Sequence, residues 1–397
     1  MKYYIIAGEA SGDLHGSNLM KGLYSLDREA EIRFWGGDLM KQVHDTSELH
    51  SSPDETYGGL VHHYKDGAVM GFWEVVSKGR RLLENLHLCK EDILSHQPDA
   101  VILIDYPGFN FRIAEFAHNH GLRVFYYIAP KVWASREGRI RKLKKYVDRL
   151  FIIFPFEIPY FRKKGVEFIY RGNPLVDVVD NSPAMKESRD TFIRRNRLED
   201  KPSIALLAGS RKPEISTMMP VLTEFARKMH SIPAYSGYQF LIAGAPARSP
   251  EDYAPYLAPE DTYIKVLFGE TQNIIRNSVA AVVNSGTASL ETVLFNVPQV
   301  VGYRVNWLTY IIGRHIIKVH YISLGNLCID RLAFRELIQD DCNADEILKE
   351  VIRLVEDREY REHMLADYAE IRRLLGGAGA SEAVAGAMIE ELRKQSE

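Results

Sequence analysis

The sequence has few of the features that mark secreted, membrane-spanning or nucleic-acid-binding proteins. Its 397 residues include only three cysteines, Cys89, Cys328 and Cys342, which lie far apart and form no C-x-x-C pair. Such sparse cysteines exclude a disulfide framework and favour a reducing compartment. No run reaches the roughly 18 apolar residues that span a bilayer. The net charge of -3 gives no general attraction to nucleic acid, so we expect no nucleic-acid partner.

The start of the chain also lacks the pattern of a signal peptide. The stretch KYYIIAGEASGD reaches glycine and acidic residues after a few apolar positions, whereas a signal peptide has an apolar core of roughly 7–15 residues. We therefore expect a cytoplasmic protein that touches a membrane, if at all, from the cytoplasmic side.

Several motifs of catalysis and cofactor binding are missing. The sequence contains neither G-x-G-x-x-G nor G-x-x-x-x-G-K-[ST], and no G-x-S-x-G, so the usual dinucleotide, P-loop and serine-hydrolase fingerprints do not apply. It also has no D-x-D, the metal-dependent diphosphate clamp of one glycosyltransferase class. We expect no metal and no cofactor.

The chain does contain a regular alternation of short apolar runs and helical patterns. With 397 residues it exceeds the ~250–300 at which a single core usually divides, so two domains are expected. Continuous apolar strands between helices are typical of parallel sheets covered on both faces. The pattern predicts an α/β fold of two doubly wound parallel-sheet domains that face a cleft. The predicted strands are KYYIIAG, IRFWGG, VILI, LRVFYYIAP and RLFIIFPFE, then SIALLAG, YQFLIAG, YIKVLFG, SVAAVVN and PQVVGYR.

The domain boundary is predicted from a polar stretch, residues 180–202, that separates the two series of strands. We expect a first domain at residues 1–173, a second at 174–365 and a helical segment at 366–397. Within this last segment, Gly376, Gly377 and Gly379 predict a hinge before a final amphipathic helix.

One loop of the second domain has the residues of a diphosphate site. LLAGSRK places Gly209, Ser210 and Arg211 between a predicted strand and a helix. Glycine permits a close backbone approach, and a helix N-terminus with an arginine fork binds phosphate oxygens. The alternative is an ordinary strand–turn–helix with a surface arginine.

A second loop, NSGTASLE, places Ser285, Gly286 and Thr287 at another helix start. Glu291 follows one turn later, where a carboxylate can accept hydrogen bonds from two ribose hydroxyls. It can equally be an acid that stabilises the positive end of the helix dipole. The two loops together indicate a nucleotide site more specifically than either alone.

In the first domain, LIDYPGFN places Asp105 at the end of the most apolar strand. A carboxylate at the carboxyl end of a parallel strand is a candidate general base for an acceptor hydroxyl. The alternative is a structural aspartate that caps the turn before Pro107.

Two segments combine positive charge with apolar residues or with helical pattern. Residues 131–149 hold eight basic side chains, which indicate either a solvated helix face or a surface for anionic head groups.

In AVMGFWEVVSKGRRLLENLHL, bulky apolar residues precede cations, as in interfacial segments, although an ordinary buried helix is also possible. The candidates for membrane or acyl-chain contact are Val69, Met70, Phe72, Trp73, Arg80 and Arg81.

Eight short motifs follow one another along the chain: GEASGD, AVMGFWEV, IDYPGFN, APKVWA, GSR, SGTASLE, VGYR and YISLGNL. In these motifs and in their order, the sequence resembles the lipid-A-disaccharide synthase family. The resemblance runs from about residue 3 to at least residue 340.

The resemblance implies an inverting, metal-independent glycosyltransferase of the GT-B type, with two Rossmann-like domains. Members join UDP-2,3-diacylglucosamine to 2,3-diacylglucosamine 1-phosphate, form the β(1→6) lipid A disaccharide and release UDP. It further implies a peripheral protein on the inner face of the cytoplasmic membrane, and a homodimer that exchanges C-terminal segments. Because both substrates carry acyl chains, we favour the membrane- or acyl-facing interpretation of residues 68–83.

The resemblance also distributes roles over the candidate residues. The second domain binds the UDP-sugar, with Glu291 on the ribose and with Arg304 of VGYR and Asn326 of YISLGNL completing the donor site. The first domain binds the acceptor, with Asp105 as the general base and Asn110 on the same side.

The first motif, GEASGDLHG, then belongs to the acceptor side. Gly8 and Gly12 let the backbone turn tightly, and Glu9, Ser11 and Asp13 are candidates for sugar hydroxyls or for supporting the base. The acids would repel a diphosphate.

Two other functions stay open on the sequence alone. A soluble UDP-sugar transferase or epimerase explains the second domain equally well, but not the apolar and basic segment of the first. A UDP-sugar-binding regulatory protein without catalysis is disfavoured by the presence of Asp105.

Overall fold

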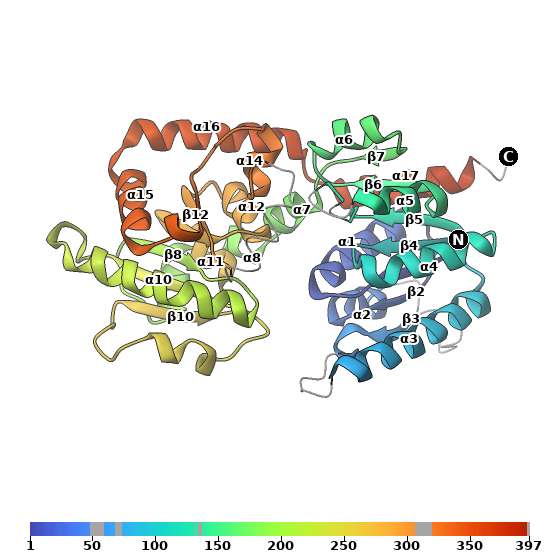
Figure 1. The fold of residues 1–397 in the computed structure, drawn as a ribbon, viewed down its shortest axis with the longest axis horizontal. Helices are drawn as coiled ribbons and strands as arrows, with labels where there is room; N and C mark the ends of the chain where they lie inside the picture. Colours follow the sequence, from blue (N-terminus) through green and yellow to red (C-terminus); the bar gives the residue numbers. More distant parts are fainter. Residues whose placement is uncertain (48–58, 68–73, 131, 134–136, 306–319, 395–397) are drawn as a thin grey trace. The chain divides into compact units, whose positions relative to one another are not determined.

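The computed structural model describes residues 1–47, 59–67, 74–130, 132–133, 137–305 and 320–394. It divides into two compact units (Figure 1). Unit 1 consists of Met1–Asp177 together with Gly376–Glu397, and unit 2 of Val178–Leu375. The α/β class and the two doubly wound parallel sheets predicted from the sequence are confirmed.

The sheet of unit 1 has seven parallel strands in the order β3-β2-β1-β4-β5-β6-β7. Their bounds are β1 Lys2–Ala7, β2 Glu31–Gly36, β3 Gly59–His63, β4 Ala100–Ile104, β5 Arg123–Tyr127, β6 Arg149–Ile152 and β7 Phe168–Tyr170. Every residue of β4 is buried, because helices cover both faces of the sheet. β1 pairs with β2 on one side and with β4 on the other, so the order of the strands reverses between β1 and β4.

The helices of unit 1 connect these strands and cover the sheet. Their bounds are α1 Ala10–Leu26, α2 Asp38–Asp45, α3 Glu74–His96, α4 Pro107–Asn119, α5 Ile140–Tyr146, α6 Glu157–Lys164 and α17 Ala380–Arg393, with short 3-10 turns η2 Tyr64–Gly67 and η3 Glu137–Arg139. In the part of the chain that the structure describes, every helix is too short or too polar to cross a bilayer.

The last helix, α17, returns to unit 1 and packs against α1. Small residues allow the close approach: a Cβ atom on Gly22 would lie 3.0 Å from the Cβ of Ala385. The carboxylate of Asp177 accepts hydrogen bonds from the N–H groups of Gly379 (2.5 Å) and Ser381 (2.9 Å) at the start of α17. The beginning of α17 is thus tied to the point where the chain leaves unit 1.

The sheet of unit 2 has six parallel strands in the order β10-β9-β8-β11-β12-β13. Their bounds are β8 Ser203–Leu207, β9 Gln239–Gly244, β10 Ile264–Phe268, β11 Ala280–Asn284, β12 Gln299–Tyr303 and β13 Glu336–Ile338. β8 pairs with both β9 and β11, so the order reverses between β8 and β11.

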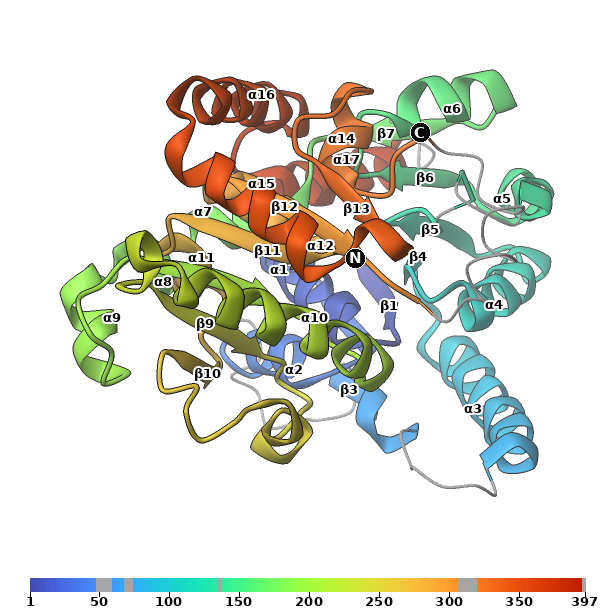
Figure 2. The same cartoon turned by 60° about the vertical axis from the view of Figure 1, so that its left-hand side comes forward.

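Helices α10 and α15 pack against each other over the sheet of unit 2 (Figure 2). The helices of this half are α7 Pro174–Asp180, which runs across the division, α8 Pro183–Lys186, α9 Arg189–Arg195, α10 Lys212–Ser231, α11 Thr271–Arg276, α12 Thr287–Leu294, α14 Leu324–Ile329, α15 Ala344–Glu356 and α16 Arg358–Leu375. Four 3-10 turns accompany them: η4 Pro233–Tyr235, η5 Pro250–Asp252, η6 Ala254–Tyr256 and η7 Gln339–Asp341.

Candidate functional site

The loops singled out in the sequence lie at the two places where the strand order reverses. In unit 1, the loops after β1 and β4 begin at Gly8 and Asp105. In unit 2, the loops after β8 and β11 begin at Ala208 and Ser285. Doubly wound sheets bind ligands at the carboxyl ends of strands, where the order reverses. Each unit therefore has one candidate binding edge.

The two loops of unit 1 touch one another. Only glycine fits at position 8, because a Cβ atom there would overlap the ring of Tyr106. Burial, followed by the nearby Glu9 carboxylate, raises the pKa of Tyr106. Glu9 and Ser11 are exposed, so this edge presents a carboxylate and a hydroxyl to solvent beside the β4 loop.

The backbone of Asp105 is held in an unusual conformation. Asp105 and Tyr106 both have left-handed backbone angles, with φ of 43° and 44°, which cost on the order of 1–3 kcal/mol for each non-glycine residue. The Asp105 carbonyl accepts hydrogen bonds from the Tyr126 hydroxyl (2.6 Å) and the Asn110 amide (2.9 Å), and its N–H donates to Tyr127 (3.2 Å). Surrounding groups thus fix the backbone of this partly buried residue at the end of β4.

Tyr126 is part of this support, and its hydroxyl stays protonated. Burial raises the pKa of Tyr126 far above its ordinary value, and the Asp105 charge raises it further. A neutral hydroxyl always has a proton to donate to the Asp105 carbonyl. No local sequence pattern indicated this role, since β4 and β5 become neighbours only in the sheet.

The role expected for Asn110 changes in the structure. Asn110 is fully buried, and its amide donates to the carbonyls of Ile104 (3.2 Å) and Asp105 (2.9 Å). Its amide thus supports the backbone at Asp105, whereas its side-chain oxygen is buried without a hydrogen-bond partner among the described residues. Asn110 lies in the first turn of α4, which begins at Pro107.

Asp13 is likewise taken up by the protein itself. Its side chain is only 2% exposed. Its carboxylate accepts hydrogen bonds from the N–H groups of Gly37 (2.8 Å), Leu39 (3.1 Å) and Met40 (3.1 Å) at the start of α2. A buried anion at a helix N-terminus stabilises that helix, so we replace the expected sugar contact of Asp13 by this structural role. Gly12 is buried against Ala7.

In unit 2, the loop after β8 is organised by Glu214. The Glu214 carboxylate accepts hydrogen bonds from the N–H groups of Ser210 (2.9 Å) and Arg211 (3.1 Å). Gly209 has a φ of +100°, and a Cβ atom there would lie 2.5 Å from Glu214 Oε2 and 2.8 Å from the Asn284 amide nitrogen. The N–H groups of Ser210 and Arg211 are therefore occupied. An anion beside them would depend on side chains such as the Arg211 guanidinium, which is 76% exposed and lies 3.7 Å from Glu214 Oε1.

The loop after β11 leaves its helix start open. Helix α12 has Gly286 at its N-cap with no side-chain capping bond, and nothing lies within 4 Å of a Cβ atom placed on Gly286. Gly286 and Thr287 are exposed, whereas the Ser285 hydroxyl donates to the Ile322 carbonyl (3.2 Å). An open helix N-terminus is suited to an anion.

Glu291 lies on α12 at the end of a chain of hydrogen bonds. It accepts from the Gln272 amide (3.2 Å), and the Gln272 carbonyl oxygen accepts from the Ser182 hydroxyl (2.5 Å). Burial raises the pKa of Glu291, and the bond from Gln272 partly offsets this. Neither Gln272 nor Ser182 could be predicted as a partner of Glu291, because the three residues lie in different segments of the chain.

The last two expected donor residues differ in their surroundings. Asn326 is fully buried and makes hydrogen bonds to Ala333 (2.8 Å), Phe334 (3.0 Å) and Glu336 (2.8 Å). It holds α14 against β13, so the structure gives it an internal role in place of donor contact. Arg304 follows β12 and is partly exposed.

The expected membrane-facing residues are only partly covered by the structure. Val69, Met70, Phe72 and Trp73 lie outside the described residues. Arg80 and Arg81 are exposed on α3, and Arg80 pairs with Glu84 (2.9 Å). On the same helix Leu83 is 67% exposed.

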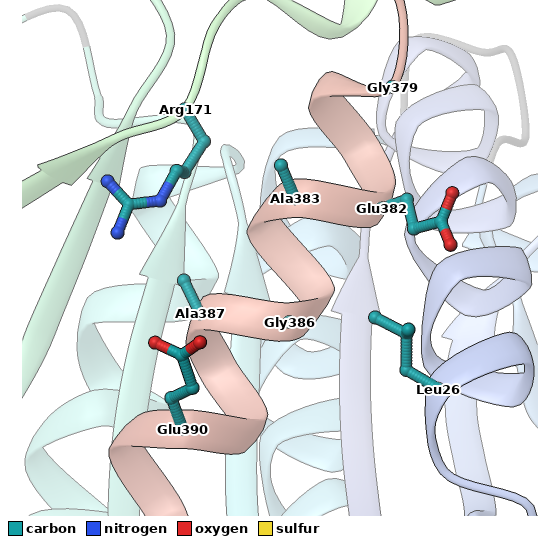
Figure 3. Close-up of a pocket in the computed structure, with 8 residues that line it drawn as sticks. All are labelled: Leu26, Arg171, Gly379, Glu382, Ala383, Gly386, Ala387 and Glu390. Carbon is teal, nitrogen blue, oxygen red and sulfur yellow. The ribbon is translucent and has the colours of Figure 1, made fainter.

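A pocket of about 410 Å³ lies along α17 (Figure 3). Arg171 and Glu390 lie on one side of this helix, and Glu382 and Leu26 lie on the other. None of the expected site residues lines this pocket.

Residues 3–384 match the family model described as lipid-A-disaccharide synthetase. Among curated proteins, the chain is 36% identical over 391 residues to the lipid-A-disaccharide synthase of Geobacter metallireducens, covering 98% of this chain and 97% of the relative. It is 37% identical over 383 residues to that of Syntrophus aciditrophicus, covering 96% and 95%.

Solved structures with the same fold have far lower sequence identity. The UDP-GlcNAc 2-epimerase of Neisseria meningitidis bound to UDP-GlcNAc aligns with a TM-score of 0.69 at 12% identity, covering 98% of this chain and all of the other. The glycosyltransferase of kitacinnamycin aligns with a TM-score of 0.60 at 12% identity, covering 98% of each. At such identities these structures show the GT-B-type fold.

Proposed function

The chain belongs to the lipid-A-disaccharide synthase family of glycosyltransferases, and on this premise we propose its substrates and mechanism. It joins UDP-2,3-diacylglucosamine to 2,3-diacylglucosamine 1-phosphate, with inversion, to give the β(1→6) disaccharide 1-phosphate and UDP. The observation that carries the proposal is the family match over nearly the whole chain. The position of the candidate residues at the two strand-order reversals supports it.

We assign UDP binding to the edge of unit 2. The diphosphate lies at the open N-terminus of α12, beside Gly286 and Thr287, where unpaired N–H groups and the helix dipole favour anions. Arg211 adds a charged fork from the neighbouring loop, and Glu291 accepts from the ribose hydroxyls. Ser210 and Arg304 complete this edge. UDP is a good leaving group, so the site must stabilise its charge more than protonate it.

We assign the acceptor to the edge of unit 1, with Asp105 as the general base. The 6-hydroxyl of the acceptor attacks the anomeric carbon of the donor while its proton passes to the Asp105 carboxylate. The bond to UDP breaks on the opposite face, which inverts the anomeric configuration. The fixed backbone of Asp105 supports this role, because a general base must be held within hydrogen-bond reach of the proton that it removes. Glu9 and Ser11 contact sugar hydroxyls.

We further propose that the start of α3 faces the inner surface of the cytoplasmic membrane. Its exposed Arg80, Arg81 and Leu83 combine cations with an apolar side chain, the composition that binds anionic interfaces. The apolar residues 69–73 directly precede this helix in the sequence.

A homodimer that exchanges C-terminal segments is the last part of the proposal. Gly376 and Gly379 both have positive φ, of 92° and 93°, so glycine gives the segment before α17 the freedom that an altered path requires.

The transfer reaction itself tests the proposed function. Wild-type protein mixed with both diacyl substrates should release UDP and form the disaccharide 1-phosphate, which mass spectrometry and NMR would identify with a β(1→6) linkage. Omitting the acceptor should abolish UDP release. Turnover of a deacylated UDP-sugar with no use of the acylated donor would contradict the proposal.

Membrane binding is tested by replacing two apolar residues that precede α3 in the sequence, together with the exposed Leu83 on α3. We expect Phe72→Ala/Trp73→Ala/Leu83→Ser to lower co-sedimentation with vesicles of anionic lipid severalfold, because burial contributes about 0.8 kcal/mol per CH₂ group. The matched control is Leu332→Ser, which replaces a leucine of unit 2 that is 60% exposed. Equal vesicle binding by the folded triple variant and the wild type would refute the membrane face.

A further inference from the structure

Three aromatic side chains gather at the carboxyl ends of β5 and β6. The ring of Trp133, after β5, packs edge-on against Phe156, after β6, with 4.8 Å between ring centroids. Phe156 also stacks on Phe154, with centroids 5.2 Å apart and an interplanar angle of 12°. Trp133 and Phe156 are partly exposed, whereas Phe154 is buried. The edge of the sheet thus presents aromatic surface to its surroundings.

A buried carboxylate fixes the orientation of this cluster. Glu157 is only 1% exposed, and it accepts a hydrogen bond from the Trp133 indole N–H (3.1 Å). It also accepts from the N–H groups of Ile153 (3.1 Å) and Phe154 (3.0 Å) in the loop after β6. Burying a charged group is costly unless it is well hydrogen-bonded. The three hydrogen bonds therefore stabilise the buried Glu157 carboxylate in this position. The mechanism proposed above makes no use of it.

The cluster continues the acceptor edge of unit 1. β5 pairs with β4 on one side and β6 on the other, and the Asp105 N–H donates to Tyr127 at the end of β5. In the spatial order β1, β4, β5 and β6, the loops therefore carry first the exposed Glu9 and Ser11, then Asp105, and finally the aromatic rings. An acylated sugar has the same layout, with hydroxyl groups at one end and hydrocarbon at the other.

We propose that Trp133, Phe154 and Phe156 form the subsite for an acyl chain of the acceptor, and that Glu157 is the positioning residue that holds Trp133 in place. The inference rests on the proposed transfer to an acylated glucosamine. The sugar lies over the β1 and β4 loops, with its 6-hydroxyl at Asp105, while one chain runs over the rings. Aromatic walls with few polar groups are the usual lining of sites for apolar ligands.

The test compares two acceptors that differ only in their chains: a long-chain 2,3-diacylglucosamine 1-phosphate and its diacetyl analogue. For each variant, kcat/KM is measured with both acceptors. We expect Trp133→Ala to lower the preference for the long-chain acceptor about tenfold, the scale of discrimination by an apolar pocket, while KM for the donor stays unchanged. Trp133→Phe should keep most of the preference. Glu157→Gln should lower it partially, because the indole loses its fixed orientation.

The matched control is Phe168→Ala, which removes a partly buried ring at the first residue of β7. β7 pairs in parallel with β6, so this ring lies at the amino ends of the strands, away from the carboxyl ends that carry the cluster. Phe168→Ala should leave the ratio between the two acceptors unchanged. A folded Trp133→Ala variant that keeps the wild-type ratio, or slows both acceptors equally, would overturn the subsite. If wild-type protein transfers to neither acceptor, the proposed function itself fails.

Discussion

Asp105→Asn is expected to lower the transfer rate by roughly 10²–10⁴-fold, the usual contribution of a general base, while UDP binding stays near wild type. Asparagine has nearly the same shape but cannot accept the proton of the 6-hydroxyl. The hydrogen bonds that fix this turn go to the Asp105 backbone, so the substitution leaves them in place. Single-turnover transfer and calorimetric UDP binding would measure the two effects separately.

The control for this prediction lies at the opposite end of β4. Asp99 is an exposed carboxylate just before the amino end of β4, and it accepts a hydrogen bond from the Lys2 N–H (2.8 Å). Asp99→Asn should leave turnover per folded molecule unchanged. If Asp105→Asn transferred at close to the wild-type rate, the general base would have to be another group.

The second large effect is expected for Arg211→Ala, which should weaken UDP binding and slow transfer together. We expect a loss in kcat/KM of roughly 10²–10³-fold, the range seen when one charge-stabilising donor is removed. The physical reason lies in Glu214, which already occupies the N–H groups of Ser210 and Arg211. The loop after β8 must therefore act on phosphate through its side chains.

Lys212 offers a matched control for Arg211, because it is the next residue and its side chain is 74% exposed. Lys212→Ala should change UDP affinity little, because the Lys212 ammonium group is a point charge that lies outside the loop after β8. Arg211→Lys should recover only part of the loss, because lysine lacks the planar fork that binds two oxygens at once. Unchanged UDP affinity in Arg211→Ala would rule out a phosphate role.

The fold was largely predictable because its signals are local. Apolar runs such as VILI, in β4, are continuous in the sequence, and each is followed by a helical pattern. Three strands were not predicted from the sequence, β3, β7 and β13, and they have only three to five residues. β3 and β7 are only half-buried throughout, and β13 has a single buried residue. They are edge strands of the two sheets. An edge strand is less buried than a central one, so it does not need the continuous apolar run by which the central strands were predicted.

The candidate loops were also predictable, but the roles of individual side chains within them were not. Asp13, Asn110 and Asn326 have the chemistry of ligand-binding residues, and the structure buries all three among backbone groups. Which polar side chain caps a helix and which faces solvent depends on elements that are distant in the sequence. Asp13, for example, meets the start of α2 some 24 residues further along the chain.

The two doubly wound sheets, the loops at their strand-order reversals and the family could therefore all be predicted from the amino-acid sequence. Hydrophobic periodicity and short motifs are properties of neighbouring residues, so they are visible before folding. The folded structure was needed to see that Glu214 accepts hydrogen bonds from the N–H groups of Ser210 and Arg211, and that Glu157 holds Trp133. It also linked Gln272 to Glu291. A hydrogen bond is directional and short-ranged, so its partners are fixed only when the packed elements bring them within about 3 Å.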